Sequence, residues 1–218
     1  MAASITFVWH GLSCFSIEAR NGDVCANLVT DPFGSDTGLK LPRNLAGDLV
    51  TISNGGAERD NAAAVKPAGE RKPLLISSPG EYEVRGLFVY GTSAPESPDT
   101  TLYRYEIGDL SFAHLGNLAS GLSDAQRELL EDIDILLVPV GDAAVLNAKK
   151  AVEIVTELEP RIVIPMHYAV PGLKMKLDPV EKFIKEIGAG SPERAAKFKA
   201  VKKDLPAEET KTVILELD

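Results

Sequence analysis

The first half of the chain alternates apolar and polar positions with the period of two that is typical of β-strands. Short runs rich in β-branched and aromatic residues follow one another, separated by turn signals such as Asn21-Gly22-Asp23. They predict strands at residues 5–9, 13–18, 24–30, 49–53, 74–77, 84–91 and 100–116, the last with a hairpin turn at Gly108-Asp109. The Gly- and Ala-rich stretch 54–69 predicts a loop.

The second half changes to a helical period. Ser123 and Gln126 resemble a capping box that opens a helix, and residues 147–158 place their apolar side chains on one helical face. Asp178 predicts the cap of a helix that starts at Pro179 and stops at Gly188. A further helix is expected from 191–193, and apolar strands at 133–140, 161–165 and 212–217. Strands first, then alternating strands and helices, indicate a layered α/β or α+β domain.

Composition narrows the class of protein. The 218 residues include 23 Lys and Arg against 32 Asp and Glu, a formal net charge of -9. An acidic surface repels phosphate backbones, which argues against nucleic acid as a partner. We find no apolar run of the ~18 residues that a membrane span needs and no secretory signal, so we expect a cytoplasmic protein that does not bind membranes.

Metal-binding residue types are scarce. Cys14 and Cys25 show no C-x-x-C spacing, and there are three histidines: His10, His114 and His167. Any site that needs four or five imidazoles is therefore excluded.

Six segments, in order, resemble one known family. They are 9–15, Thr30-Asp31-Pro32-Phe33, 48–53, 78–86, His114-Leu115-Gly116 and 164–168. Together they are similar to the short-form metallo-β-lactamase-fold hydrolases over nearly the whole chain. The resemblance implies a single domain spanning 1–218 with an α/β (α+β) fold: a four-layer αββα sandwich. It also implies that metals would be held at one edge by loops that follow strands.

The metal-binding motifs of that family are altered here. Where relatives carry T/S-H-x-H-x-D-H, this chain reads Ser53-Asn54-Gly55-Gly56-Ala57-Glu58-Arg59. Asn54 and Gly56 therefore stand at histidine positions, Glu58 at the aspartate and Arg59 at the last histidine. Asn117 replaces a bridging carboxylate, and the early W-x-G-H-S pattern has become Trp9-His10-Gly11-Leu12-Ser13.

These changes remove the chemistry of a zinc site. Zinc takes imidazole, carboxylate or thiolate ligands, whereas Gly56 has no side chain and Asn54 and Asn117 offer neutral carbonyl oxygens. The guanidinium of Arg59 stays charged and repels a cation. Without a metal, the pKa of a bound water is not lowered to about 7. We therefore expect no cofactor, with zinc as the alternative.

The histidines have two interpretations each. His167 is the one ligand position retained, and it is either a metal ligand or acid–base group, or a histidine held by packing at a strand end. His114 is either beside the site or a core histidine, and we favour the core. We assign His10 no role, and Asp31, before a proline, is expected to support a turn.

The charged residues also leave alternatives open. Glu81 with Glu58 and His167 would form a reduced metal site, or Glu81 would cap its own loop. Arg59 would replace the lost positive charge by pairing with Glu58, Glu81 or Asp31. The candidate ligand-binding residues at the former site edge are Asn54, Gly55, Gly56, Glu58, Arg59, Glu81, His114, Asn117 and His167.

Three functions follow from this sequence. The first is a metallo-β-lactamase-fold protein that has lost its dinuclear zinc site and binds a small molecule or a protein. The second is a metal-dependent hydrolase with a reduced or relocated site, and the third is a structural or oligomer-forming module. Nucleophile alternatives are weak: the G-x-S-x-G pattern is missing around Ser53, Ser77 and Ser78, and Cys14 lies in an apolar strand.

Overall fold

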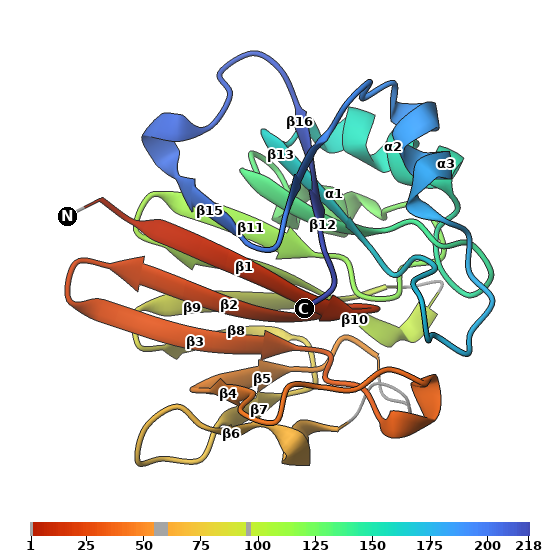
Figure 1. Cartoon of the computed structure of the whole chain (residues 1–218). Helices are drawn as coiled ribbons and strands as arrows, with labels where there is room; N and C mark the ends of the chain where they lie inside the picture. Colours follow the sequence, from red (N-terminus) through yellow and green to blue (C-terminus); the bar gives the residue numbers. More distant parts are fainter. Residues whose placement is uncertain (1, 55–60, 95–96) are drawn as a thin grey trace.

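Two β-sheets packed face to face make up most of the molecule (Figure 1). The computed structural model describes residues 2–54, 61–94 and 97–218. In strand order, one sheet comprises β15 (Phe198–Val201), β1 (Ser4–Gly11), β2 (Cys14–Asn21), β3 (Val24–Thr30), β5 (Leu49–Thr51) and β7 (Leu74–Ile76). We call it the N-terminal sheet.

The second sheet, which we call the C-terminal sheet, mixes antiparallel and parallel strands. Its order is β14 (Glu193–Ala195), β16 (Lys211–Leu215), β13 (Ile162–Met166), β12 (Ile135–Pro139), β11 (Leu110–His114), β10 (Ser97–Ile107), β9 (Leu87–Ala94) and β8 (Gly80–Val84). A small pair, β4 (Ala46–Gly47) and β6 (Lys66–Pro67), forms a separate two-stranded sheet. The expected β-sandwich is therefore confirmed.

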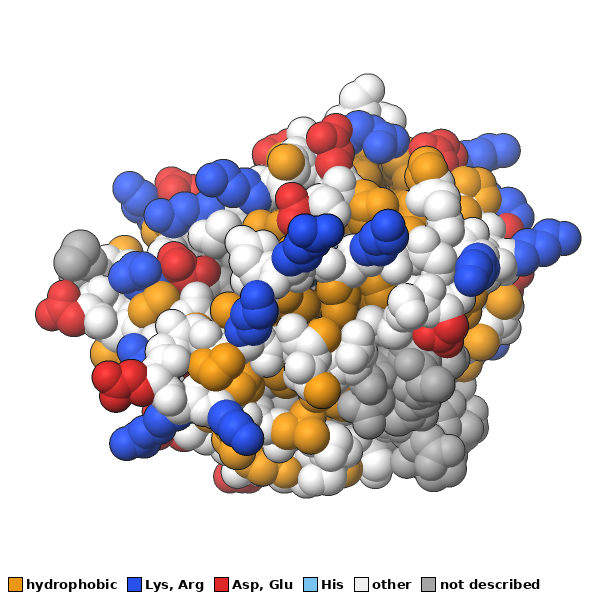
Figure 2. All heavy atoms as spheres, turned by 60° about the horizontal axis from the view of Figure 1, so that its bottom comes forward, with side chains coloured by type: hydrophobic (Ala, Val, Ile, Leu, Met, Phe, Trp, Pro, Cys, Tyr) orange, Lys and Arg blue, Asp and Glu red, His pale blue; other side chains and the backbone are white. Residues whose placement is uncertain are grey.

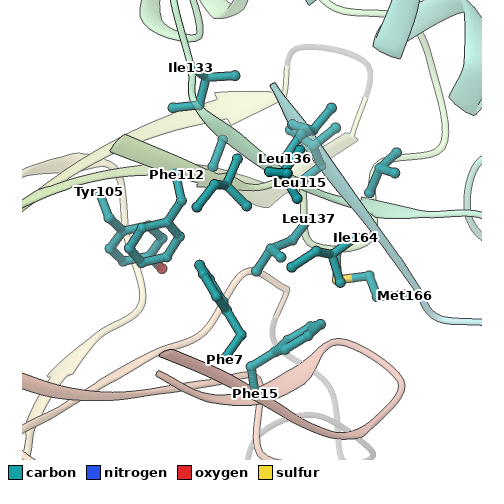
Figure 3. Packing of buried hydrophobic residues seen from close by; sticks show 14 of the residues in the cluster. Phe7, Phe15, Tyr105, Phe112, Leu115, Ile133, Leu136, Leu137, Ile164 and Met166 are labelled. Atoms are coloured by element: carbon teal, nitrogen blue, oxygen red, sulfur yellow. The ribbon is translucent and has the colours of Figure 1, made fainter. Parts of the chain in front are cut away.

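The core lies between the sheets because each strand turns alternate apolar side chains inward. Phe7 and Phe15 of the N-terminal sheet point toward Phe112, Leu137 and Met166 of the other (Figure 3). The ring of Phe7 meets that of Phe112 edge to face, with centroids 5.3 Å apart. Fully burying each such ring stabilises the fold by about 1.5–3 kcal/mol.

The outer faces of the sandwich are covered differently. Helices α1 (Asp124–Leu129), α2 (Ala148–Leu158) and α3 (Val180–Ile187) lie beyond the C-terminal sheet (Figure 1). The N-terminal sheet instead packs its outward Cys14, Val29 and Ile52 against loop side chains such as Phe33 and Leu39. The 3₁₀ turns η1 (Ser35–Thr37) and η2 (Ala62–Ala64) belong to these covering loops, and η3 (Lys202–Asp204) follows β15.

Of the three helix starts predicted from local sequence signals, the structure confirms one capping interaction and contradicts two other expectations. The Ser123 capping box is confirmed: Gln126 N–H donates to Ser123 Oγ and Ser123 N–H to Gln126 Oε1. Asp178 does not cap α3, because its carboxylate accepts instead from Lys182 Nζ at 2.7 Å. The helix expected at 191–193 is wrong: the chain there forms β14, which pairs in parallel with β16.

A buried carboxylate holds together the end of the C-terminal sheet at which β11, β12 and β13 begin. Asp134 accepts from the N–H of Ser111 at 3.0 Å and from Lys202 Nζ at 2.7 Å, with Arg161 at 3.5 Å.

Among the described residues, no helix is long and apolar enough to cross a lipid bilayer.

Candidate functional site

Loops that follow strand ends converge at one edge of the sandwich. Asp31 comes directly after β3 and Ser53 two residues after β5, while Asn117 and His167 follow β11 and β13 of the other sheet. Ser13 occupies the tight turn between β1 and β2. We call this group the edge cluster: Ser13, Asp31, Ser53, His114, Asn117 and His167.

Ser13 contacts Asn117 and His167, the two residues that the sequence resemblance places at metal positions. Its hydroxyl lies 3.0 Å from His167 Nδ1 and 3.3 Å from Asn117 Oδ1. The exposed fractions of Ser13, His167 and Asn117 are 1%, 0% and 4%. A hydroxyl has one proton to donate, so when it is given to Asn117, His167 Nδ1 must be the donor toward Ser13.

Burial of the Ser13–His167 pair limits its chemistry. A serine beside an imidazole is the arrangement of an activated nucleophile. Here both side chains are almost wholly buried, and the Ser13 hydroxyl also lies within hydrogen-bond distance of Asn117. The pair links the β1–β2 turn of the N-terminal sheet to the end of β13 in the C-terminal sheet.

Asp31 organises the other half of the edge cluster. Its carboxylate accepts from the backbone N–H of Ser53 at 2.6 Å and from the Ser53 hydroxyl at 2.5 Å. Gly116 is required at this point because a Cβ there would collide with the Ser53 side chain. Asp31 thus ties the strand ends of β3 and β5 together, close to Asn54.

His114 is a hydrogen-bonded core residue. Its Nδ1 accepts from Gly116 N–H at 3.2 Å, so Nε2 carries the proton and donates to the carbonyl of Ser13 at 2.9 Å. Burial lowers the pKa of His114, and the carboxylate of Asp31, 3.9 Å from Nε2, opposes that shift in part. The imidazole is therefore neutral and uses both nitrogens within the protein.

The other sequence-predicted residues divide into three groups. Asn54 borders the edge cluster and donates through Nδ2 to Thr100 Oγ1 at 3.3 Å. Glu81 is exposed on the edge strand β8, on the face opposite the packed Tyr82 and Val84, and so points away from the edge cluster. Gly55, Gly56, Glu58 and Arg59 lie outside the described residues.

The chain on either side of that segment is anchored beside Asp31. Ser53 is bound by the Asp31 carboxylate, and Asn61 donates its backbone N–H to Pro32 O at 2.8 Å and its side-chain amide to Phe33 O at 3.1 Å. Residues 54 and 61 are therefore both held next to the edge cluster.

Sequence reasoning missed Ser13 and Thr100 as partners of site residues. Ser13 carried a usable signal, since it belongs to the same 9–15 segment that supports the resemblance. Cys14, next to it, is buried, and burial together with Asp31 raises the pKa of its thiol well above the ordinary value. As predicted, it is a core thiol.

Comparison with known proteins identifies the family. Residues 6–167 match the model of the β-lactamase superfamily domain. The chain belongs to this superfamily, whose metallo-β-lactamase fold accounts for the α+β sandwich described above.

Particular relatives cover most of the chain. A UPF0173 protein of Pyrococcus abyssi is 42% identical over 186 residues, 76% of this chain and 84% of that protein. A UPF0173 metal-dependent hydrolase of Salinibacter ruber is 37% identical, covering 83% of this chain and 92% of that one. A shorter match, 38% identical, spans 47% of a UPF0173 protein of Pyrococcus furiosus.

One solved structure has a fold similar to that of this chain over nearly its full length. It is a protein of Thermotoga maritima assigned to the metallo-β-lactamase superfamily as a Zn-dependent hydrolase. The two structures superpose with a TM-score of 0.77 at 31% identity, over 97% of this chain and 99% of that one.

The described side chains alone do not make up the zinc centre that such names imply, and the candidate positions Gly55, Gly56, Glu58 and Arg59 lie outside them. Among residues 2–54, 61–94 and 97–218, no group of three or more His, Cys, Asp or Glu side chains is placed to hold a metal ion. Asn54 and Asn117 supply neutral amides, and both carboxylate oxygens of Asp31 are engaged by Ser53. Of the two imidazoles in the edge cluster, that of His114 uses both nitrogens within the protein, so His167 is the candidate metal ligand.

Proposed function

We propose that this chain is a non-hydrolytic member of the superfamily that binds a small molecule or a protein partner at the edge cluster. The observation that carries the proposal is the Ser13 hydroxyl, which bridges Asn117 and His167. An uncharged serine and amide at these positions do not neutralise a dication. The binding residues we propose are Asn54, Gly55, Gly56, Glu58, Arg59, Asn117 and His167.

A metal-dependent hydrolase is the second candidate. The names of the Salinibacter ruber relative and the Thermotoga maritima protein favour it. Its site would combine His167 with carboxylates such as Glu58, or use ligands placed elsewhere. The two candidates predict opposite metal contents.

Protein purified without added metal is expected to carry zinc, manganese and iron far below one atom per chain. Inductively coupled plasma mass spectrometry measures this directly. Hydrolysis of generic lactam and phosphodiester substrates should stay at the level of the His167→Ala variant. Stoichiometric metal that is lost in His167→Ala, together with activity that falls in parallel, would establish the hydrolase instead.

Arg59 gives a second test of the proposal. It is the one Lys or Arg in the segment 55–60 and stands beside Glu58. The buried Asp31 lies next to Ser53 and Asn61, which precede and follow that segment. We expect its guanidinium to pair with Glu58 or Asp31, and Glu81 is disfavoured by its outward position. Arg59→Ala should then cost about 1–3 kcal/mol of stability, read as a lower melting temperature, because a buried carboxylate loses its cation.

Arg59→Lys serves as the control, since it retains the charge but not the forked geometry. It is expected to recover part of the lost stability. A melting temperature for Arg59→Ala equal to that of the wild type would mean that the arginine does not compensate a carboxylate.

A further inference from the structure

A cavity of about 750 Å³ lies between the free edges of the two sheets, away from the edge cluster. It is bounded by β7, the last strand of the N-terminal sheet, and by β8 and the turn that follows it. Asp48, at its wall, precedes β5, whereas Ser53 follows that strand. At ~3.3 Å per residue the two positions are separated by roughly 16 Å.

Charged side chains line this cavity. They are Asp48, Glu70, Arg71, Lys72, Glu83 and Arg85, beside the apolar Leu74 and Val84. The three acidic and three basic side chains that line the cavity balance in formal charge. What the cavity offers a ligand therefore depends on which of these groups the protein already uses.

Two of the carboxylates are engaged by the chain itself. Asp48 Oδ2 accepts from the backbone N–H and the side-chain amide of Asn27, at 2.8 and 2.9 Å. Glu83 Oε1 accepts from the N–H of Gly86 at 2.5 Å. These bonds fix both carboxylates to the walls and reduce their attraction for a cation.

The cations retain donors toward the cavity. Arg85 gives its Nε–H to Cys25 O at 2.7 Å, which leaves the Nη groups of the guanidinium, with Asp48 3.8 Å from Nε. Arg71 and Lys72 are exposed and form no ion pair with any residue in the described parts of the chain. The lower side of the molecule also presents many Lys and Arg side chains around apolar groups, although the whole chain is acidic (Figure 2).

We infer that the cavity between β7 and β8 binds a small organic anion, a phosphate or carboxylate compound with an apolar portion. Arg71, Lys72 and the Nη groups of Arg85 would hold the anionic group through charge-assisted hydrogen bonds. Leu74, about half exposed, and Val84 would cover the apolar portion. The site is separate from the edge cluster and requires no metal.

Isothermal titration of the full chain with phenyl phosphate and, separately, with phenylacetate tests this inference and distinguishes the two kinds of anion. The wild type is expected to bind one of them with a millimolar or tighter Kd. The double variant Arg71→Ala/Lys72→Ala should bind it about tenfold or more weakly, since two charged donors are lost.

The matched control is Lys149→Ala/Lys150→Ala, which removes the same charge from an adjacent exposed pair on α2. It should leave the Kd unchanged. Equal weakening in the two double variants would reduce the effect to net charge and overturn the site, as would wild-type protein that binds neither anion. Neither result bears on metal content, so failure here is distinct from failure of the proposed function.

Discussion

Replacing Asp31 with alanine is expected to lower the free energy of unfolding by about 3 kcal/mol. The carboxylate is 1% exposed and accepts from both the N–H and the hydroxyl of Ser53. Alanine would leave that buried N–H without its acceptor, at a cost of about 1–3 kcal/mol. Residue 31 has a φ of 38°, in the left-handed region. Aspartate tolerates this conformation better than alanine because its side chain forms local hydrogen bonds.

Urea unfolding followed by circular dichroism measures the loss. Asp31→Asn keeps one acceptor oxygen and tolerates positive φ, so it should lose about half as much. Asp36→Ala, at an exposed position of η1, is the matched control and should change stability by less than about 0.5 kcal/mol. If Asp31→Ala unfolds at the same urea concentration as Asp36→Ala, the carboxylate does not hold the strand ends.

Stability is also expected to fall as the pH is lowered through 6.5. Burial lowers the pKa of His10 and of His114 below the ordinary value of 6.5, with Asp218 and Asp31 respectively opposing the shift in part. Below pH 6.5 the unfolded chain therefore binds protons that the folded protein does not. Each histidine then reduces stability by up to about 1.4 kcal/mol per pH unit, until the pH reaches its folded pKa.

Urea midpoints measured between about pH 7.5 and pH 5, above the ordinary range of carboxyl groups, record this slope. His10 Nε2 lies 2.7 Å from Ser16 Oγ, so His10→Gln retains a polar partner for that hydroxyl while removing the titrating group. The variant should show a shallower loss than the wild type. A midpoint independent of pH across this window would contradict the expected neutral state of both imidazoles.

The sequence pattern predicts two kinds of element well: helices with one apolar and one polar face, and turns set by their own residues. Helix α2 forms from Ala148 to Leu158 with Ala151, Ile154 and Val155 buried, and the Gly108-Asp109 turn joins β10 to β11. Residues 191–195 failed because pairing with β16, a tertiary contact, decides their conformation rather than the Ser-Pro-Glu signal for a helix.

The site was harder to predict because a motif gives order along the chain but not the direction of a side chain. The expectation for Glu81 rests on its position after a strand, where the resemblance places the edge of the site. The alternation of β8 turns Tyr82 and Val84 inward and Glu81 outward. For Ser13, the resemblance of segment 9–15 indicates a place near the site, but it does not identify the partner His167, 154 positions away.

The pairing of β1 with β15 has a consequence for how the chain is made. Ser4 lies opposite Val201 and Phe7 opposite Phe198, so one edge of β1 is completed by residues almost two hundred positions later. Contacts this distant in sequence slow folding, and synthesis proceeds from the N-terminus. During synthesis this edge of β1 therefore stays unpaired and open to neighbouring chains until β15 has left the ribosome.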